Sequence, residues 1–316
     1  MEVYSKILTI LESRFPGSAF KTSTKYRTMH SRIYVIDVVD KTGSRSTKKI
    51  IVKYCRSSSP DEIDHEFESL LAFRDGCNDS RIRVPNPILV DSANKIIVMD
   101  HVGGSNLKEL MLKLKLPDGS QINQIIDLAA IALSKFHELF VRENGTHSLA
   151  SPFLEREASL DWYAKHLPEC GLRSLSKSFL DFAVWNILVS NSSGIGITLI
   201  DFPARDCIST PHLDLARFKF SLEILREHPQ FRFLGIEPWI LQELYGRFLG
   251  TYLTVTDQRM NDVDYSLISH LEREYARKLK TIYENEESPI RLKLEGIYMK
   301  RFLSRLLNDD SELVSK

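Results

Sequence analysis

The chain has 316 residues, 43% of them hydrophobic, and its 42 Lys and Arg residues balance its 42 Asp and Glu residues. This length allows two lobes with a sizeable core, and the balanced charge gives no global basic field for nucleic acid or an anionic membrane. No apolar run approaches the roughly 20 residues that span a bilayer, and the opening M-E-V-Y-S-K carries an early acid, so we expect neither a membrane segment nor a signal peptide.

The cysteines and histidines point away from disulfides and structural zinc. The four cysteines are widely spaced, with no C-x-x-C pair, at Cys55, Cys77, Cys170 and Cys207. This spacing favours free thiols in a reducing compartment, and we expect a cytoplasmic protein. The nine histidines form no H-E-x-x-H pattern, so no dedicated zinc site is expected.

Residues from about 20 to 100 show mainly strand patterns. Arg32–Val39 and Ile50–Tyr54 are rich in β-branched residues and flank a polar turn, so they predict a hairpin. Helical spacing follows over Asp61–Phe73, whose acidic opening favours a helix N-terminus. Two further strands are predicted, at Ile88–Asp91 and Lys95–Met99. This part of the chain therefore predicts a small antiparallel sheet with one helix.

Helical patterns dominate after Asn106. Gly103 and Gly104 allow a sharp bend into a helix capped near Ser105 and Asn106. The helical patterns include Ile122–Phe140, Asp262–Asn285 and Pro289–Leu307. We find no internal repeat and no low-complexity segment, so the second part of the chain reads as a larger helical region.

One strand pair interrupts these helices and carries the most informative motif. Asn186 leads into a short apolar strand, I-L-V, and the turn at 190–196 reverses the chain into a second strand, I-T-L-I. Asp181 lies five residues before Asn186, and Asp201 directly follows the second strand. A hairpin of this kind would hold Asn186 and Asp201 near one another at its open end.

This trio suits phosphoryl transfer from a magnesium nucleotide. Asp181 would orient or deprotonate an acceptor hydroxyl, while the amide oxygen of Asn186 and the carboxylate of Asp201 would hold the metal against the phosphates. The alternative is structural, because Asn and Asp are common in turns. The register of all three with two apolar strands favours the functional interpretation.

The order of strands, one helix, strands and then a helical region resembles the bilobal protein-kinase-like fold, an α+β architecture. More closely, the chain resembles the aminoglycoside/choline phosphotransferase family over roughly residues 20–225. The family's catalytic loop H-G-D-x-x-x-x-N is matched by F-L-D-F-A-V-W-N at 179–186, its metal motif by L-I-D-F at 199–202, and its later D-L-A by Asp214-Leu215-Ala216. The resemblance implies a nucleotide-binding lobe at 1–101 and a helical lobe with the catalytic loop, metal motif and acceptor site at 102–316.

The resemblance also implies roles in ATP binding. Lys53 lies in the apolar strand I-I-V-K-Y, where an unpaired lysine would cost free energy, and it would contact the α- and β-phosphates. Its partner is expected to be Glu66, with Glu68 as the competitor, and a solvent-facing Lys53 is the structural alternative. The connector between lobes would place Asp100 and Val102 at adenine through their backbones, with Met99 at the back of the pocket.

The phosphate-covering loop would lie at 25–31, K-Y-R-T-M-H-S, which has no glycine and offers Ser31. Asp214 is expected to cap or brace the catalytic loop from a helix start. His137, among apolar neighbours at helical spacing, reads as a core or loop-bracing histidine rather than a ligand. Arg205 and His212 are weaker candidates for contact with substrate or phosphate.

The chain departs from the family pattern at several positions, including Val184 in place of a common proline and Pro203 after D-F. Phe179 replaces the usual histidine, so it could brace the loop by packing but not by hydrogen bonding, and Leu180 replaces glycine. No A-P-E segment or long activation loop follows Asp201, which disfavours a protein kinase. The D-F-x-P-W-N likeness at 181–186 suggests a sugar or glycan acceptor, to be met by the C-terminal helices and residues 143–178.

The predicted function is therefore an ATP- and Mg2+-dependent phosphotransferase that acts on a hydroxyl of a small molecule. The alternative is a catalytically inactive kinase-like protein that binds nucleotide or a partner as a scaffold. Retention of Lys53, Asp181, Asn186 and Asp201 together favours the enzyme. Dispersed basic residues without interleaved aromatics disfavour a nucleic-acid partner.

Overall fold

The computed structural model describes residues 2–27, 31–39, 46–113, 119–141, 157–172, 174–190, 194–205, 207–227, 237–284, 302–304 and 306–307. The chain forms two compact units. Unit 1 comprises Met1–Gly104 together with Thr198–Asp206, and unit 2 comprises Ser105–Ile197 together with Cys207–Lys316.

Unit 1 is built on a five-stranded antiparallel sheet in the order β1-β2-β3-β6-β5. The strands are β1 (Ala19–Arg27), β2 (Ser31–Val39), β3 (Ser46–Cys55), β5 (Pro87–Asp91) and β6 (Ile96–Asp100), and a two-residue strand, β4, spans Ile82–Arg83. The predicted hairpin is confirmed as β2–β3, in which Ile33 lies opposite Lys53. The prediction of a phosphate-covering loop at 25–31 is wrong for Lys25–Arg27, because these residues belong to strand β1. Residues Thr28–His30 lie outside the described residues.

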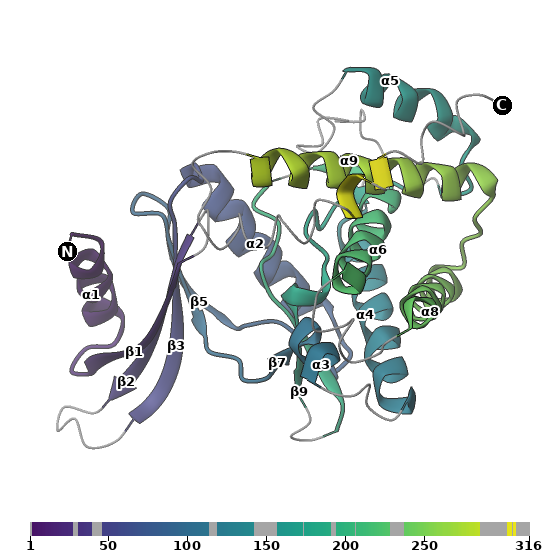
Figure 1. Ribbon diagram of the computed structural model, residues 1–316. Coiled ribbons are helices and arrows are strands. Elements are labelled where there is room, and N and C mark those ends of the chain that lie inside the picture. The colour runs from purple at the N-terminus through teal and green to yellow at the C-terminus, as the bar shows by residue number, and fades with distance from the viewer. Residues whose placement is uncertain are drawn as a thin grey trace. The chain divides into compact units, whose positions relative to one another are not determined.

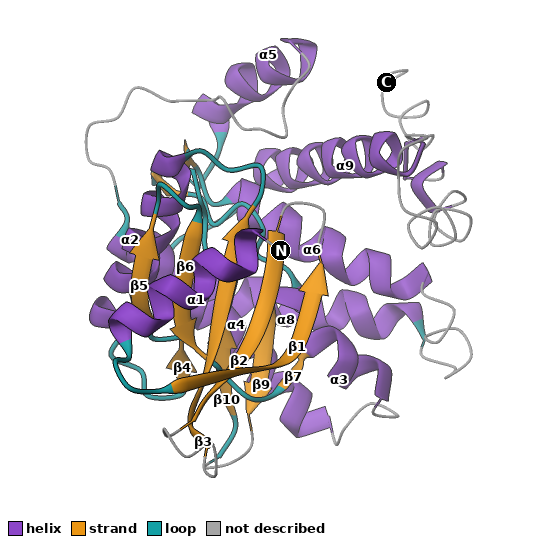
Figure 2. Ribbon diagram, turned by 90° about the vertical axis from the view of Figure 1, so that its left-hand side faces the viewer, coloured by secondary structure: helices purple, strands orange, loops and turns teal. Residues whose placement is uncertain are grey.

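Two helices cover the two faces of this sheet. Helix α1 (Glu2–Arg14) buries Ile7 and Leu11 against residues that include Val98. Helix α2 (Pro60–Gly76) buries Ile63 against residues that include Ile97. Because successive residues of a strand point to opposite faces, α1 and α2 lie on opposite sides of the sheet, and Figure 2 shows α1 crossing its strands. The sequence predicted only one helix here, so α1 is an addition.

Helix α2 begins slightly earlier than its acidic opening predicted. Ser59 is the N-cap, and its hydroxyl accepts from the Glu62 N–H at 3.2 Å while the Glu62 carboxylate accepts from the Ser59 N–H at 2.8 Å. This reciprocal capping box, with Pro60 in the first turn, satisfies N–H groups that a helix start otherwise leaves without partners. It fixes the start of the helix that carries Glu66.

Unit 2 is mainly helical, as predicted (Figure 1). Its described helices are α3 (Leu107–Lys113), α4 (Gly119–Leu139), α5 (Glu157–His166), α6 (His212–Glu227), α8 (Pro238–Thr256) and α9 (Asp262–Glu284). The predicted helices at Ile122–Phe140 and Asp262–Asn285 are confirmed as α4 and α9, whereas most of Pro289–Leu307 lies outside the described residues. None of the described helices is long and apolar enough to cross a membrane.

Short strands and turns position the motif within these helices. They are β7 (Ser105–Asn106), β8 (Ser176–Lys177), β9 (Ile187–Ser190), β10 (Gly196–Leu199) and β11 (Ile208–Ser209), with 3-10 turns at Leu167–Glu169 and Val184–Asn186. The predicted motif strands are confirmed as β9 and β10, neighbours in one sheet, and the chain passes from unit 2 into unit 1 within β10. Asn106 caps α3 as expected, because its Oδ1 accepts the Glu109 N–H at 2.7 Å.

A chain of aromatic rings joins the unit 2 helices to the motif. Phe136 of α4 lies 5.1 Å from Phe179 between ring centroids, and Phe179 lies 5.3 Å from Phe182. Phe182 lies 5.8 Å from Phe218 of α6, which stacks on Phe248 of α8 at 3.9 Å. Such rings bury large apolar areas and favour tilted or offset contacts. The segment that carries Asp181 is therefore anchored in the core by the residues on either side of it.

Candidate active site

The candidate residues form two clusters, one in each unit. In unit 1, the Nζ of Lys53 lies 2.6 Å from Oε1 of Glu66 and 2.5 Å from Oδ1 of Asp201. The side chains of Lys53 and Glu66 are 13% and 8% exposed, whereas that of Asp201 is 50% exposed. Lys53 thus pairs with Glu66, and the competing residue, Glu68, is 74% exposed and lies near His65.

The charge of Lys53 is secured by its carboxylate neighbours. Burial by itself lowers the pKa of Lys53, but the negative charges of Asp201 and Glu66 outweigh it and raise this pKa well above its usual value. The neighbouring thiol behaves differently, because burial raises the pKa of Cys55 to about 12. The cluster therefore holds a permanent cation beside an inert thiol.

Asp201 is positioned by the backbone at the end of β10. Its φ is 62°, in the left-handed region, which is uncommon for residues other than glycine, Asn and Asp. The next residue, Phe202, is 3% exposed, and its ring lies 5.5 Å from that of Phe73 on α2. Packing of Phe202 against the same helix that carries Glu66 explains why Asp201 reaches Lys53.

In unit 2 the second cluster is built on the segment 179–186, here called the Asp181 loop. The Nδ2 of Asn186 donates to the Asp181 backbone carbonyl and to Asp181 Oδ2, both at 2.9 Å. Asn186 is 8% exposed, and the 3-10 turn at 184–186 places it directly before β9. Because the amide nitrogen is committed to Asp181, the amide oxygen is the atom of Asn186 that can serve a metal.

Asp214 braces this loop from the first turn of α6, as its place in the sequence predicted. Its Oδ1 accepts the Leu180 N–H at 2.8 Å and the Ser178 hydroxyl at 2.9 Å, and its Oδ2 accepts the Phe179 N–H at 2.8 Å. The residue is fully buried. A buried carboxylate is tolerated because hydrogen-bond donors surround it, and those bonds fix the loop backbone immediately before Asp181.

A further donor to Asp214 is a histidine from another element. His137 of α4 places Nε2 at 3.0 Å from Asp214 Oδ2 and Nδ1 at 2.8 Å from the Tyr252 hydroxyl. The family motif would have a histidine at position 179, where this chain has Phe179. Here the loop keeps an imidazole in its support, provided by His137 from outside the motif.

Leu180 departs from the family pattern at a conformationally demanding position. Its φ is 66°, and the family's glycine would adopt this value without a steric cost. The side chain is 9% exposed, so burial of Leu180 compensates for part of the strain. Leu180 therefore adopts the left-handed backbone conformation that glycine would adopt more readily.

One residue of this cluster, Arg217, was not predicted from the sequence. It follows the D-L-A match on α6, and its guanidinium donates to Asp181 Oδ1. A basic residue one turn after a helix start carries no signal in the sequence that it will contact a loop 36 residues earlier. Only the packing of α6 against the loop reveals it.

The other residues predicted to meet the nucleotide lie in unit 1. Met99 and Asp100 end β6. The backbone N–H of Asp100 donates to the Asn86 carbonyl at 2.9 Å, so the backbone carbonyl of Asp100 is the group that could face adenine. Val102 follows in the connecting segment, partly buried. Ser31 begins β2 opposite Cys55 and is 7% exposed. Their contact with ATP stays a prediction.

The weaker candidates Arg205 and His212 have structural partners instead. In unit 1, Nε of Arg205 donates to Glu62 Oε1 at 2.6 Å. In unit 2, His212 is fully buried, with Nδ1 at 2.8 Å from Thr210 Oγ1 and Nε2 at 2.7 Å from Asp264 Oδ1. The expectation that His212 could meet substrate is wrong, because no face of its ring is accessible.

The same buried network brings together three side chains of kinds that can bind metal ions, and the sequence did not predict this cluster. Ligand atoms of Cys170, His212 and Asp264 lie within 4.8 Å of one another. Asp264 also accepts the N–H groups of Gly171 and Leu172 and, at the start of α9, Asn261. Since both of its oxygens accept two bonds, Asp264 ties the segment before β8 to α9 and does not offer a lone pair to a metal.

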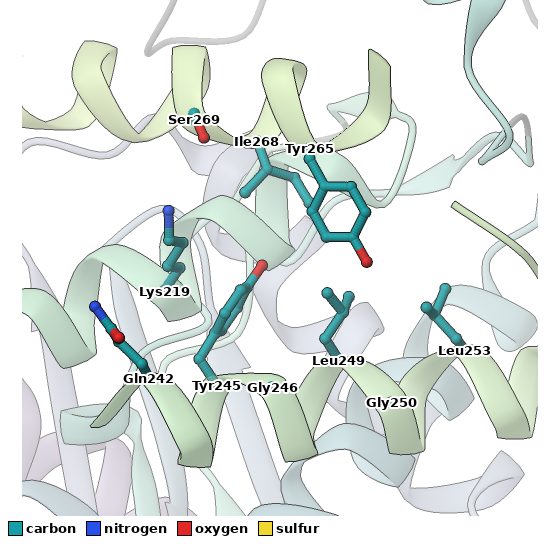
Figure 3. A pocket seen from close by; sticks show the side chains of 10 residues that line it. All are labelled: Lys219, Gln242, Tyr245, Gly246, Leu249, Gly250, Leu253, Tyr265, Ile268 and Ser269. Carbon is teal, nitrogen blue, oxygen red and sulfur yellow. The ribbon is translucent and has the colours of Figure 1, made fainter. Parts of the chain in front are cut away.

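Unit 2 also contains a pocket of about 400 Å³ among α6, α8 and α9 (Figure 3). Its lining residues are Lys219, Gln242, Tyr245, Gly246, Leu249, Gly250, Leu253, Tyr265, Ile268 and Ser269. The Tyr245 hydroxyl points toward α9. No residue of the Asp181 loop lines this pocket, so it is not assigned to the acceptor.

Comparison with known proteins places the fold. No family model matches the sequence, and no curated protein matches it. This chain is similar to a solved structure of glucosamine kinase in complex with glucosamine, ADP and inorganic phosphate. The match covers 97% of this chain and 87% of the glucosamine kinase chain, with a TM-score of 0.58 and 14% sequence identity. For crystal form B of glucosamine kinase, the match covers 95% of this chain and 84% of the glucosamine kinase chain, with a TM-score of 0.51 and 14% sequence identity. The chain thus has the α+β kinase-like fold that its sequence predicted.

Proposed function

We propose that this chain is an ATP-dependent phosphotransferase that phosphorylates a hydroxyl of a small molecule, with a sugar as the acceptor class. The observation that carries the proposal is the Lys53 cluster. A buried strand lysine paired with a helix glutamate and with the aspartate after β10 is the arrangement that protein kinases use to hold ATP phosphates. The braced Asp181 loop supplies the complementary carboxylate and amide.

The proposed roles follow the chemistry of each group. Lys53 binds the α- and β-phosphates, and Glu66 keeps the lysine in place. Asp181 orients the acceptor hydroxyl for in-line attack on the γ-phosphorus. The nucleotide base lies against Met99 and the backbones of Asp100 and Val102, with Ser31 at the phosphates. Positioning and charge neutralisation supply most of the rate enhancement in this type of reaction.

The residues present fit a magnesium ion. Asn186 has a committed amide nitrogen and therefore offers oxygen, and Asp201 is a half-exposed carboxylate. Mg2+ prefers oxygen ligands, including one or two carboxylates together with substrate phosphates. Asn186 and Asp201 would hold the ion, which when bound neutralises charge on the β- and γ-phosphates.

The comparison with glucosamine kinase supports a sugar acceptor, because that structure contains an amino sugar together with ADP and spans nearly the same chain length. The proposal includes a division into a nucleotide-binding lobe at 1–101 and a catalytic and acceptor lobe at 102–316. Membership in the aminoglycoside/choline phosphotransferase family is proposed on the motif matches at Asp181, Asn186, Asp201 and Asp214.

The test is nucleotide turnover with Mg-ATP against sugars, amino sugars, aminoglycosides, choline-like alcohols and nucleosides. Acceptor-dependent ADP release is expected for at least one sugar, and Asp181→Asn should lower it by about 10³-fold or more. The control is Asp262→Asn, a surface carboxylate in the first turn of α9, which should leave turnover unchanged. Tight Mg2+-dependent ATP binding without turnover on any acceptor would favour the scaffold alternative instead.

A further inference from the structure

The Asp181 carboxylate is held on one side by Arg217. The Nε and Nη2 of Arg217 lie 2.8 and 2.5 Å from the same oxygen, Oδ1. The Arg217 side chain is 15% exposed and that of Asp181 is 37% exposed. A guanidinium that donates two N–H groups from a fixed plane restricts the carboxylate more than a single ammonium could.

Two aromatic rings fix the guanidinium itself. Its central carbon lies 4.9 Å from the ring centroid of Trp185, within the loop, and 5.3 Å from that of Tyr275 on α9. Tyr275 is 3% exposed, so this ring belongs to the packed interior. Cations stack favourably on aromatic faces, and Arg does so more often than Lys. Arg217 is therefore held by α6, α9 and the loop together.

These contacts leave Asp181 a single free acceptor position. Each carboxylate oxygen has about two lone-pair sites. The two bonds from Arg217 occupy those of Oδ1, and the bond from Asn186 Nδ2 occupies one of those of Oδ2. Among the described residues no further donor to Asp181 is present, so one lone pair of Oδ2 is left for an acceptor hydroxyl.

We infer that Arg217 is a positioning residue that fixes Asp181 so that only one direction of approach is productive, and that it thereby selects which hydroxyl of a polyhydroxyl acceptor is phosphorylated. This inference rests on the proposed function. In the transfer, the acceptor oxygen bonds to the γ-phosphorus, and the bond from that phosphorus to the bridging oxygen breaks, its electron pair leaving on ADP. The hydroxyl proton passes to Oδ2 of Asp181 and then to solvent.

The experiment compares Arg217→Met and Arg217→Lys with the wild type on a sugar acceptor. Arg217→Met should lower kcat by about 100-fold, since misplacement of a reacting group by about 1 Å costs this much, while KM for ATP changes by less than about 3-fold. Phosphorus NMR should show a mixture of positional isomers in place of one product. Added ethylguanidinium should restore part of the rate to Arg217→Met, and Arg217→Lys should retain an intermediate rate because it keeps one donor.

Arg226→Met is a matched control. Arg226 lies on the same helix, nine residues beyond Arg217, where it pairs with Glu223 at 2.9 Å and lies 6.0 Å from the ring of Phe302. This variant should keep both the rate and the single product. Equal losses in the two variants would mean that α6 is merely destabilised, and the inference would be overturned.

Other outcomes also decide the matter. A slow Arg217→Met enzyme that still gives one isomer and shows no rescue would reduce Arg217 to a structural role. A rise in KM for the acceptor alone would make it a binding residue instead. If the wild type phosphorylates no acceptor, the proposed function fails, and the clamp is then tested by NMR. The Arg217 Nε–H should exchange with solvent at least about 10-fold faster in Asp181→Ala, and an unchanged exchange rate would refute the clamp.

Discussion

The Nε2 atom of His137 lies 3.0 Å from Oδ2 of Asp214, the oxygen that also accepts the Phe179 N–H. The two residues are 77 positions apart. This bond joins the last turn of α4 to the brace of the Asp181 loop, so an imidazole supports the loop although the motif itself begins with phenylalanine. The opposite nitrogen of His137 meets the Tyr252 hydroxyl, which extends the support to α8.

Replacement of His137 by leucine should loosen this support. His137→Leu leaves the Tyr252 hydroxyl and one lone pair of Asp214 without partners in the interior, so we expect a loss of about 2–4 kcal/mol in the free energy of unfolding. Urea denaturation measures this loss. The control is Lys135→Met on the same helix, whose exposed pair with Glu138 should contribute less than about 0.5 kcal/mol. A His137→Leu protein as stable as the wild type would show that the bond is dispensable.

At Leu180 the backbone conformation should make glycine more stabilising than alanine, the reverse of the usual order. At φ 66° a Cβ atom is strained, so Leu180→Gly should be more stable than Leu180→Ala by about 1 kcal/mol. At Ala183, where φ is −141°, the usual order should hold, and Ala183→Gly should lose about 0.5–1 kcal/mol. Thermal unfolding of the three variants checks both signs. An alanine variant at 180 that equals the glycine variant would show that position 180 is unstrained.

Loss of the Lys53 cation should impair nucleotide use. Lys53→Met is expected to lower kcat/KM for ATP by about 100-fold or more, because it removes a preorganised positive charge that would face the phosphates. The control is Lys49→Met on the same strand. The wild-type Lys49 side chain is 46% exposed and pairs with Asp37 at 3.6 Å, and the variant loses this pair. Steady-state kinetics with the melting temperature recorded for each variant separates catalysis from unfolding. Equal kinetics in both variants would remove Lys53 from the site.

Asp264 predicts a loss of stability in acid. Burial opposes its ionisation, but the bond from His212 and the backbone N–H groups of Asn261, Leu172 and Gly171 outweigh burial and lower its pKa below the usual 3.8. A depressed folded-state pKa stabilises the protein above the unfolded-state value, and this stabilisation is lost as pH falls through the folded-state value.

The corresponding test compares Asp264→Asn with the wild type by urea unfolding from pH 7 to pH 2.5. The variant should be less stable by about 3 kcal/mol at pH 5–7, because it removes a buried carboxylate that accepts four hydrogen bonds. The difference should shrink as the pH falls below about 4. A difference that stays constant across this range would mean that the carboxylate charge contributes nothing.

Elements with a strong local pattern could be predicted from the sequence. The alternating β-branched residues of β2 and β3 and the apolar stripe of α4 are properties of neighbouring residues, and the structure confirms them. Helix α1 and the polar strand β1 were missed. The burial of Ile7 and Leu11 depends on a sheet made by later residues, and β1 is an edge strand whose backbone pairing with β2 compensates for a weak side-chain pattern.

The sequence by itself determined which groups could perform phosphoryl transfer, because Asp181, Asn186 and Asp201 are spaced around two short apolar strands. Lys53 lies in another apolar strand, where a lysine needs a charged partner. The tertiary structure decided how those groups are held. Glu66 rather than Glu68 meets Lys53 because of the face that α2 presents to the sheet. His137 reaches Asp214, which braces the Asp181 loop, and Arg217 reaches the loop itself, only because α4 and α6 pack there. Contacts between residues so distant in the chain leave no periodic signal in the sequence.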